Sequence, residues 1–400
     1  MATKTPSDRG KWVITGGAGF IGCHAAARLY AAGHRVVIVD NLSRRGTDAN
    51  LAWLQAQGVD HLIQADIRDA SAMNDVLAEH ADADVVLHLA GQVAVTTSVA
   101  DPRADFEANA LGTFNILEAV RTAAQGRPAL FYSSTNKVYG NLEHVEVVQR
   151  DGRYAYADRP LGVDEDERLD FHSPYGCSKG AGDQYVRDYA RIYGLKTVVF
   201  RQSCIYGTRQ FGIEDQGWIA WFSIAATLGK PFTIFGDGQQ IRDALWVDDL
   251  IALYRRAWER IDAARGEVFN VGGGPSNTLS LLELVRAIER AVGRPLHPGF
   301  ADWRPGDQRV FVADIRKAKR LLDWSPEVSI AEGIERLLQW VRDHRDLFKS
   351  AGVASPTQPG HAPPGIQRGP GMLGMPIPPP RAPRVTAKLC WGPALGRKVG

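Results

Sequence analysis

The fold is decided by residues 11–22, which read KWVITGGAGFIG. The first five residues are an apolar run typical of a buried strand, and a helical pattern follows residue 22. The glycines at 16, 19 and 22 permit a tight turn and let backbone N–H groups approach a pyrophosphate at the start of that helix. A second apolar run, residues 35–39, then leads to Asp40. This strand–turn–helix–strand unit predicts a dinucleotide-binding site.

Asp40 indicates which dinucleotide is bound. It follows the last glycine at close to the spacing of about 20 residues at which a carboxylate contacts the adenosine ribose 2′-hydroxyl. Its negative charge would repel a 2′-phosphate, so the sequence favours NAD over NADP. Arg44 and Arg45 argue the other way, because arginine at this place can accommodate that phosphate. Glycines that merely pack a helix on a strand are the less favoured alternative.

Short apolar runs separated by helical patterns continue along the chain. The expected strands are residues 62–65, 84–91, 129–135 and 196–201, with a helix from about 105 to 122. This alternation predicts an α/β fold, a doubly wound parallel Rossmann sheet, in which ligands gather at the carboxyl ends of the strands. Asp40, Asp66, Ala90 and Thr135 all fall at such ends. We expect the adenine to be recognised near Asp66 and the cofactor to lie close to the small residues around Ala90.

Tyr175 and Lys179 are the candidate acid and base. Their spacing of four residues places both side chains on one helix face, and Ser173 and Pro174 suit the start of that helix. An ammonium beside a phenol stabilises the phenolate, which lowers the pKa of the tyrosine and makes it usable in proton transfer near neutral pH. Alone, the same spacing is common in ordinary amphipathic helices, so its meaning depends on the dinucleotide site that precedes it.

The regular alternation ends after residue 203. Residues 204–348 predict a smaller mixed domain, mainly substrate-binding, with arginines suited to a diphosphate. Residues 243–275 are expected to return to the NAD-binding Rossmann domain of residues 11–203. Residues 141–172 are expected to form a surface loop over the active site. Residues 350–400 are rich in proline and glycine and predict a disordered basic tail.

Charge and cysteine usage exclude several classes of function. The chain has a net charge of +2, but its last fifty residues carry six basic residues and no acid, so the remainder is acidic and does not predict a nucleic-acid-binding face. The four cysteines lie far apart without metal-ligand spacing, which indicates reduced thiols and no metal site. The polar start of the chain has no signal-peptide core, and no apolar stretch is long enough to span a bilayer. We therefore expect a cytoplasmic protein with no membrane partner.

The motifs gain specificity in combination. They are the three glycines, Asp40, His88-Leu89-Ala90-Gly91, Asn109-x-x-Gly112-Thr113, Ser133-Ser134-Thr135 and Tyr175-x-x-x-Lys179. Over about residues 11–345 the chain resembles the extended short-chain dehydrogenase/reductase family, of which NDP-sugar epimerases and dehydratases form the largest branch.

The resemblance implies roles for individual residues. Tyr175 would be the acid and base, Lys179 would anchor the nicotinamide ribose and lower the pKa of the tyrosine, and Thr135 would hydrogen-bond the reacting sugar hydroxyl. The implied NAD contacts are Gly16, Gly19, Phe20, Ile21, Gly22, Asp40, Asn41, Asp66, Ile67, Leu89, Ala90, Gln92, Tyr175 and Lys179. The implied substrate contacts are Gln92, Thr135, Gln210, Arg242 and Arg304, of which the two arginines would hold the diphosphate.

Departures from the family pattern narrow the subfamily. Nucleotide-sugar 4,6-dehydratases carry an Asp-Glu pair after the catalytic threonine, whereas this chain has Asn136 and Lys137, so it lacks the acid and base for water elimination. UDP-hexose 4-epimerases typically have an asparagine where Cys204 stands. Four stretches instead resemble the CDP-paratose 2-epimerases: residues 91–98, 133–140, 169–180 and 209–218.

The resemblance thus implies an isomerase, an NAD-dependent nucleotide-sugar epimerase that inverts C2 of a CDP-dideoxyhexose, CDP-paratose to CDP-tyvelose, through a transient 2-ketosugar. A UDP-hexose 4-epimerase or another C4-oxidising NDP-sugar enzyme is the first alternative, and a non-catalytic NAD-binding protein is the second. Relatives assemble as dimers or tetramers through helix packing, so a homo-oligomer is also implied. The nucleotide base, the sugar and the oxidised carbon rest on the resemblance alone.

Overall fold

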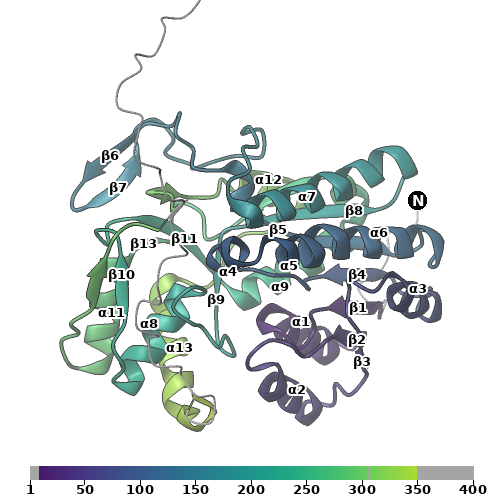
Figure 1. The fold of residues 1–400 in the computed structure, drawn as a ribbon, viewed down its shortest axis with the longest axis horizontal. Coiled ribbons are helices and arrows are strands. Elements are labelled where there is room, and N and C mark those ends of the chain that lie inside the picture. The colour runs from purple at the N-terminus through teal and green to yellow at the C-terminus, as the bar shows by residue number, and fades with distance from the viewer. Residues whose placement is uncertain (1–8, 305–306, 349–400) are drawn as a thin grey trace, which may run out of the picture. The chain divides into compact units, whose positions relative to one another are not determined.

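The computed structural model describes residues 9–304 and 307–348. A seven-stranded sheet runs through its centre, and all neighbouring strands are parallel (Figure 1). In spatial order the strands are β12 (Val268–Val271), β8 (Thr197–Gln202), β5 (Ala129–Thr135), β4 (Val85–His88), β1 (Lys11–Thr15), β2 (Arg35–Asp40) and β3 (Leu62–Gln64). Helices pack on both faces, so the predicted doubly wound parallel Rossmann sheet is confirmed.

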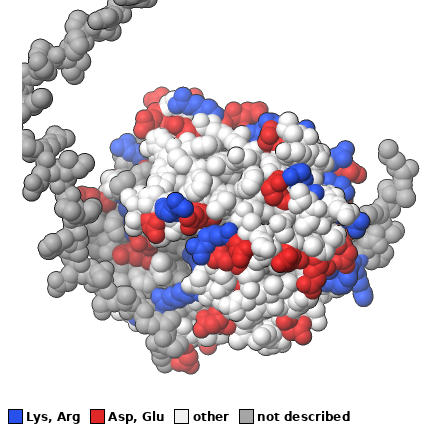
Figure 2. All heavy atoms as spheres, turned by 45° about the vertical axis from the view of Figure 1, so that its right-hand side comes forward, with Lys and Arg blue, Asp and Glu red and all other residues white. Residues whose placement is uncertain are grey.

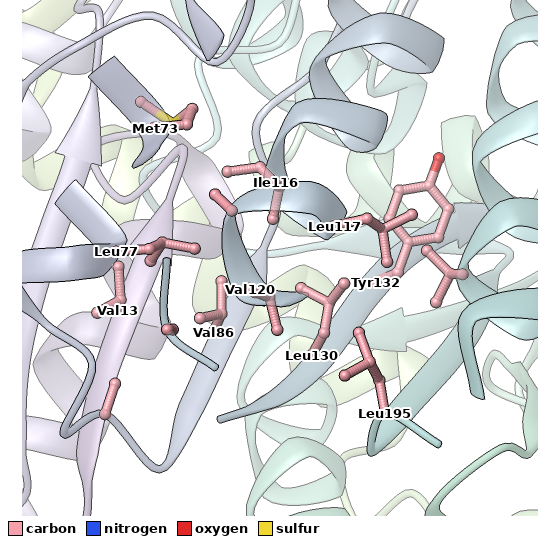
Figure 3. Close-up of a cluster of buried hydrophobic side chains, with 14 of the residues drawn as sticks. Val13, Met73, Leu77, Val86, Ile116, Leu117, Val120, Leu130, Tyr132 and Leu195 are labelled. Carbon is pink, nitrogen blue, oxygen red and sulfur yellow. The ribbon is translucent and has the colours of Figure 1, made fainter. Parts of the chain in front are cut away.

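One face of the sheet is covered by α3 (Ala70–Glu79), α6 (Gly112–Thr122) and α7 (Ser173–Tyr193). Val13, Val86 and Leu130 project from neighbouring strands into this layer, where they join Leu77 of α3 and Val120 of α6 in one buried cluster (Figure 3). Burial of this apolar surface is the main source of stability for the layer, at roughly 25 cal/mol per Å² removed from water.

The opposite face carries α1 (Phe20–Ala31), α9 (Val247–Glu259), α10 (Ile261–Ala264) and α12 (Arg316–Leu322), and α2 (Thr47–Ala56) lies beside α1. Trp12 points to this face because it is the neighbour of Val13 in β1 and successive strand residues alternate. Its ring meets Phe131 and Trp258 edge-on, with centroids 6.0 and 5.9 Å apart. Aromatic pairs in this geometry stabilise the fold by more than the burial of their apolar area alone.

After β8 the chain returns to the central sheet only at β12 and otherwise builds smaller sheets outside it. β11 (Ile241–Trp246) pairs with β9 (Cys204–Tyr206), β13 (Thr278–Ser280) and β15 (Val310–Phe311), and β10 (Thr233–Phe235) pairs with β14 (Gly299–Ala301). The helices here are α8 (Trp218–Leu228), α11 (Leu281–Val292), α13 (Ile330–Asp343) and the short η3 (Arg345–Phe348). The division of the chain at residue 203 into two domains stays a prediction, and the expected tail, residues 350–400, lies outside the described residues.

Three local features differ from the sequence prediction. Residues 141–172 include an antiparallel hairpin of β6 (Val147–Arg150) and β7 (Arg153–Tyr156). Residues 207–222 carry no helical period and were predicted to form a loop, but α8 begins at Trp218; it is buried almost all round and therefore shows no amphipathic period. The helix expected from residue 105 begins earlier, as α4 (Val95–Ala100) and α5 (Pro102–Phe106), and reaches α6 through a π-helical turn, η1 (Glu107–Leu111).

A buried ion pair ties α7 to the sheet. Asp183 of α7 and Arg201 of β8 are 0% and 1% exposed, and two hydrogen bonds of 2.9 and 3.0 Å join them. The Ser134 hydroxyl donates to the same carboxylate at 2.8 Å. Losing one partner of such a pair typically costs about 3–5 kcal/mol. The pair therefore fixes the distance between α7 and the carboxyl end of β5, where Thr135 lies.

Candidate active site

The glycine turn between β1 and α1 leaves no room for side chains. Gly16 has φ +70°, and a Cβ atom there would lie 2.7 Å from the Ala90 nitrogen. A Cβ atom on Gly22 would lie 2.1 Å from the Gly16 carbonyl oxygen. Gly19 precedes α1 and no side chain caps this helix, so its first N–H groups remain available to an anion.

Asp40 lies at the end of β2, beside this turn. Its carboxylate accepts hydrogen bonds from the Ala18 nitrogen at 3.0 Å and the Leu42 nitrogen at 2.8 Å. The backbone of the glycine turn thus fixes the carboxylate at the place expected for an adenosine ribose contact.

Asp66 and its neighbours form the next part of the same edge. Arg68 forms an ion pair with Asp66 at 2.7 Å and the Asn41 amide donates to it at 3.0 Å. Mainly because of the Arg68 hydrogen bonds, the pKa of Asp66 lies well below its usual range. Ile67 is buried against α6, where a Cβ atom on Gly112 would lie 2.6 Å from it.

The segment after β4 passes close to the glycine turn. The Leu89 nitrogen donates to the Thr15 carbonyl at 3.1 Å, which brings Ala90 beside Gly16. Gln92 donates its backbone N–H to Asn109 at 3.0 Å, whereas its side-chain amide folds back on the backbone of Ala94. The role of Gln92 as a ligand contact stays a prediction.

His88 shows what two of the quoted motifs do in the fold. Its Nδ1 lies 2.7 Å from the Thr15 hydroxyl and its Nε2 lies 3.1 Å from the Thr113 hydroxyl. Burial lowers the pKa of this histidine to about 3, so it is neutral. The residues His88 and Thr113 therefore join β4, β1 and α6, which is a structural role.

Tyr175, Thr135 and Lys179 meet at the carboxyl end of β5. Thr135 lies close enough to Tyr175 to act against the rise in the pKa of the phenol. The Lys179 amine donates to the Ser133 carbonyl and stands 4.4 Å from the centre of the Tyr132 ring. The structure thus brings together the three residues that the sequence predicted to be catalytic.

The start of α7 is fixed by two serine hydroxyls. The Ser98 hydroxyl accepts a hydrogen bond from the Tyr175 nitrogen at 3.1 Å. Ser173 has φ +66°, and its hydroxyl accepts from the Gly176 nitrogen at 3.2 Å. Ser173 therefore satisfies a free N–H group of the first turn, as the sequence predicted, although the helix bounds include it.

Burial dominates the protonation of the catalytic pair. It raises the pKa of Tyr175 to about 12, with a smaller contribution from Asp105 in the same direction, while Thr135 and Arg44 oppose it. It lowers the pKa of Lys179 to about 7, against the charges of Asp183 and Asp105. The sequence predicted that the pKa of Tyr175 is lowered. With the protein's own groups alone this prediction is wrong, because the loss of water around the phenol outweighs the effect of the neighbouring charges.

Arg242 and Arg304, two of the predicted substrate residues, lie in the part of the chain after β8 and pair with carboxylates. Arg242 stands 3.6 Å from Asp307, and Arg304 stands 2.9 Å from Asp215 and stacks 3.7 Å from the centre of the Phe235 ring.

Two further contacts bear on the substrate residues. The Asn136 amide, next to Thr135, donates to Gln308 at 3.4 Å and so ties the Arg242–Asp307 region to the catalytic end of β5. Gln210 is buried, and its side-chain oxygen has no hydrogen-bond partner among the described residues. The substrate contacts at Gln210, Arg242 and Arg304 stay predictions.

Residues 207–216 contact both α1 and the segment that follows β2. The Thr208 carbonyl lies 2.9 Å from the His24 ring nitrogen of α1, and Gln216 is hydrogen-bonded to Arg44. Arg44 interacts electrostatically with Tyr175, and burial lowers its own pKa. Its interaction with Tyr175 could not be read from the sequence, which raised Arg44 only as a phosphate contact.

The Rossmann fold and the grouping of Thr135, Tyr175 and Lys179 are typical of an enzyme that uses a dinucleotide cofactor. Residues 12–272 match the model of the NAD dependent epimerase/dehydratase family. The chain belongs to this family.

The chain aligns with individual relatives over almost the full length of those relatives. A CDP-paratose 2-epimerase of Salmonella typhi is 47% identical over 335 residues, 82% of this chain and 98% of that protein. A UDP-glucose 4-epimerase of Mycolicibacterium smegmatis is 37% identical over 331 residues, 83% of this chain and 98% of that protein. The crystal structure of the Thermus thermophilus UDP-glucose 4-epimerase in complex with NAD is 31% identical, covers 84% of this chain and 99% of that chain, and has a TM-score of 0.70.

NAD is the cofactor, and the residues present fit it. The turn in which Gly22 packs on Gly16 and the uncapped start of α1 suit a pyrophosphate, and the Asp40 carboxylate suits a ribose without a 2′-phosphate. Within the described ranges, no helix is both long and apolar enough to cross a membrane.

Asp40→Asn should weaken NAD binding by about tenfold and reduce the preference for NAD over NADP, because it removes the charge that accepts from the ribose and repels a phosphate. Titration of the cofactor-free protein with both dinucleotides measures this. The exposed Asp48→Asn in α2 is the matched control and should bind both as the wild type does. An unchanged preference in Asp40→Asn would show that another group selects the cofactor.

Proposed function

We propose that this chain is an isomerase, an NAD-dependent epimerase that inverts C2 of a CDP-dideoxyhexose and converts CDP-paratose to CDP-tyvelose. The observation that carries the proposal is the 47% identity across 98% of the Salmonella typhi CDP-paratose 2-epimerase, against 37% for the Mycolicibacterium smegmatis UDP-glucose 4-epimerase. The clustering of Thr135, Tyr175 and Lys179 supports a catalytic function.

Tyr175 is the group that moves the proton. Its phenolate takes the proton of the C2 hydroxyl, and Thr135, which lies beside Tyr175, hydrogen-bonds the same hydroxyl. Lys179, held by the Ser133 carbonyl, binds the nicotinamide ribose. NAD, when bound, supplies the redox chemistry by accepting hydride from C2 and returning it to the opposite face of the 2-ketosugar. Tyr175 then gives the proton back to the C2 oxygen, so that nothing is consumed in a cycle.

The residues after Thr135 argue against loss of water from the ketosugar. Asn136 is an amide bonded to Gln308, and Lys137 is an amine whose pKa burial lowers to about 8. Neither supplies the carboxylic acid and carboxylate that elimination needs. Return of the hydride is the outcome that these side chains leave open.

Arg242 and Arg304 are the proposed diphosphate ligands. Asp307 and Asp215 pair with them, and partly exposed pairs of this kind are worth little by themselves. A diphosphate carries more negative charge than a single carboxylate and can replace both carboxylates as the partner of the arginines. Holding the nucleotide here leaves the sugar free to turn, as inversion of one carbon requires.

Two alternatives use the same site. A UDP-hexose 4-epimerase would present C4 instead of C2 to Tyr175, and the 37% identity to the Mycolicibacterium smegmatis enzyme favours this alternative over other C4-oxidising enzymes. A non-catalytic NAD-binding protein would keep the fold without turnover.

The NAD-loaded protein should convert CDP-paratose to CDP-tyvelose, followed by NMR of the sugar. Tyr175→Phe should lower kcat at least about 100-fold, because it removes the general base, and should leave NAD bound. Tyr30→Phe in α1 is the matched control, since this side chain is 44% exposed and lies outside the site.

The outcomes separate the candidates. Turnover of UDP-glucose but not of CDP-paratose would identify a 4-epimerase, and bound NAD without turnover of either would support a binding protein. If Tyr175→Phe kept kcat within about tenfold, or roughly 1.4 kcal/mol in barrier, the assignment of the base would be wrong.

We also infer a homo-oligomer, a dimer or tetramer, formed through α6 and α7. Large apolar side chains are exposed on these two helices: Phe114 (38%), Tyr185 (51%), Ile192 (66%) and Tyr193 (50%). The rings of Phe114 and Tyr185 are in contact, with centroids 5.8 Å apart. Contiguous exposed aromatic side chains are typical of protein–protein contacts.

Phe114→Glu should convert the oligomer to a monomer in analytical ultracentrifugation, because it places a charge in the proposed contact. Phe300→Glu is the control, since Phe300 is 60% exposed on β14 and lies outside these helices. A wild-type protein that sediments as a monomer would contradict the inference.

The distribution of surface charge and the state of the cysteines bear on nucleic-acid binding and on the location of the protein. On the face drawn in Figure 2, basic and acidic side chains are interspersed, which supports the expectation that no nucleic acid binds. Cys23, Cys177 and Cys204 are free cysteines, which supports a cytoplasmic location.

A further inference from the structure

Gln308 is a buried amide that has no role in the proposed reaction. Its side chain is 1% exposed. Its Nε2 atom donates to the Gly140 carbonyl, and its Oε1 atom accepts from the Asn136 amide at 3.4 Å. Both ends of the amide are therefore bonded to the segment that follows β5, across 168 and 172 residues of sequence.

The hydrogen bonds of Gln308 set the direction of a chain that ends at Thr135. A backbone carbonyl only accepts, so the NH2 group of Gln308 faces Gly140 and its oxygen faces Asn136. The NH2 group of Asn136 then faces Gln308, which leaves its Oδ1 atom to accept from the Thr135 hydroxyl at 3.4 Å. The Lys137 nitrogen donates to the same hydroxyl oxygen at 3.2 Å. Gln308 thus determines where the Thr135 hydroxyl points.

The bond from Thr135 to Asn136 is long enough to be exchanged for a bond to the sugar. Hydrogen bonds between a hydroxyl group and an oxygen usually measure about 2.5–3.0 Å, so a bond of 3.4 Å is weak. The hydroxyl can leave the amide when a sugar oxygen comes within reach. Asn136 therefore orients the hydroxyl without competing strongly for it.

The residues beside Gln308 belong to the proposed diphosphate site. Asp307 pairs with Arg242 of β11 at 3.6 Å, and its backbone nitrogen donates to the Arg304 carbonyl at 3.2 Å. A diphosphate held by both arginines would join this segment to β11 more firmly than the pair with one carboxylate does. The segment that carries Gln308 is thus the segment that such a ligand would order.

We propose that Gln308 is a positioning residue that couples the diphosphate site to the catalytic end of β5, by orienting Thr135 through Asn136. The inference rests on the proposed function, in which Arg242 and Arg304 hold the diphosphate. Binding of the nucleotide then orders the Thr135 hydroxyl before the sugar reacts. Gln308 acts through Asn136 and not by contact with the sugar.

The test is hydrogen–deuterium exchange of residues 133–140 in the full-length, NAD-loaded protein, measured by mass spectrometry with and without saturating CDP. In the wild type, CDP should slow this exchange by at least about fivefold, the lower end of typical coupling between two sites. Gln308→Met keeps the length of the side chain and removes both hydrogen bonds, so the slowing should be lost although CDP still binds. Gln339→Met, at an exposed position of α13, is the matched control and should behave as the wild type does.

Asn136→Ala breaks the same chain at its next bond and should also lose the slowing, so it serves if Gln308→Met does not fold. With substrate, both variants should lower kcat by about tenfold and leave KM nearly unchanged. A merely structural role predicts faster exchange in the free variants with the same slowing by CDP, and this result would overturn the proposal.

The exchange measurement needs no sugar, and UDP is tested beside CDP. Slowing that Gln308→Met abolishes, in a wild-type protein that turns over neither nucleotide sugar, would contradict the proposed function and support this inference. Turnover of CDP-paratose with the slowing retained in both variants would overturn this inference and leave the proposed function. Wild-type exchange that neither nucleotide slows would overturn the inference as well.

Discussion

Burial of the Tyr175 phenol beside the Lys179 amine is the constraint on which the rest of the site depends. Each group favours its neutral form away from water, so burial raises the pKa of the phenol to about 12 and lowers that of the amine to about 7. Proton transfer at neutral pH needs the opposite forms, a phenolate and an ammonium. Neighbouring charges and the bound cofactor must therefore stabilise these charged forms in place of water.

The fold meets this constraint by fixing α7 at several points. Ser98 holds its first turn, Ser178 joins its catalytic turn to Asp105, and Asp183 joins its middle to β8. These contacts come from three different parts of the sheet and its helices. Tyr175 is thereby set against the end of β5, and the parallel arrangement of the strands places the NAD-binding residues along the same edge.

The sequence predicted those parts of the site that depend on local backbone or on short spacings. The glycine turn, Asp40 and the Tyr175–Lys179 pair belong to this class. Contacts across long separations were not predictable: Asp105 and Ser178 are 73 residues apart, and neither fits a motif by itself. The direction of the Tyr175 pKa was missed for the same reason, since burial depends on the whole fold. Helix α8 was missed because it is buried almost all round.

The central claim is that C2 of the sugar is oxidised and reduced again within one active site. The most direct measurement is turnover of CDP-paratose deuterated at C2, compared with the same sugar deuterated at C4. The account predicts a slower reaction only for the C2 label, with the deuterium retained at C2 of the product, because hydride leaves and returns without exchange with water. Loss of the C2 deuterium to solvent, or an isotope effect only from the C4 label, would contradict it.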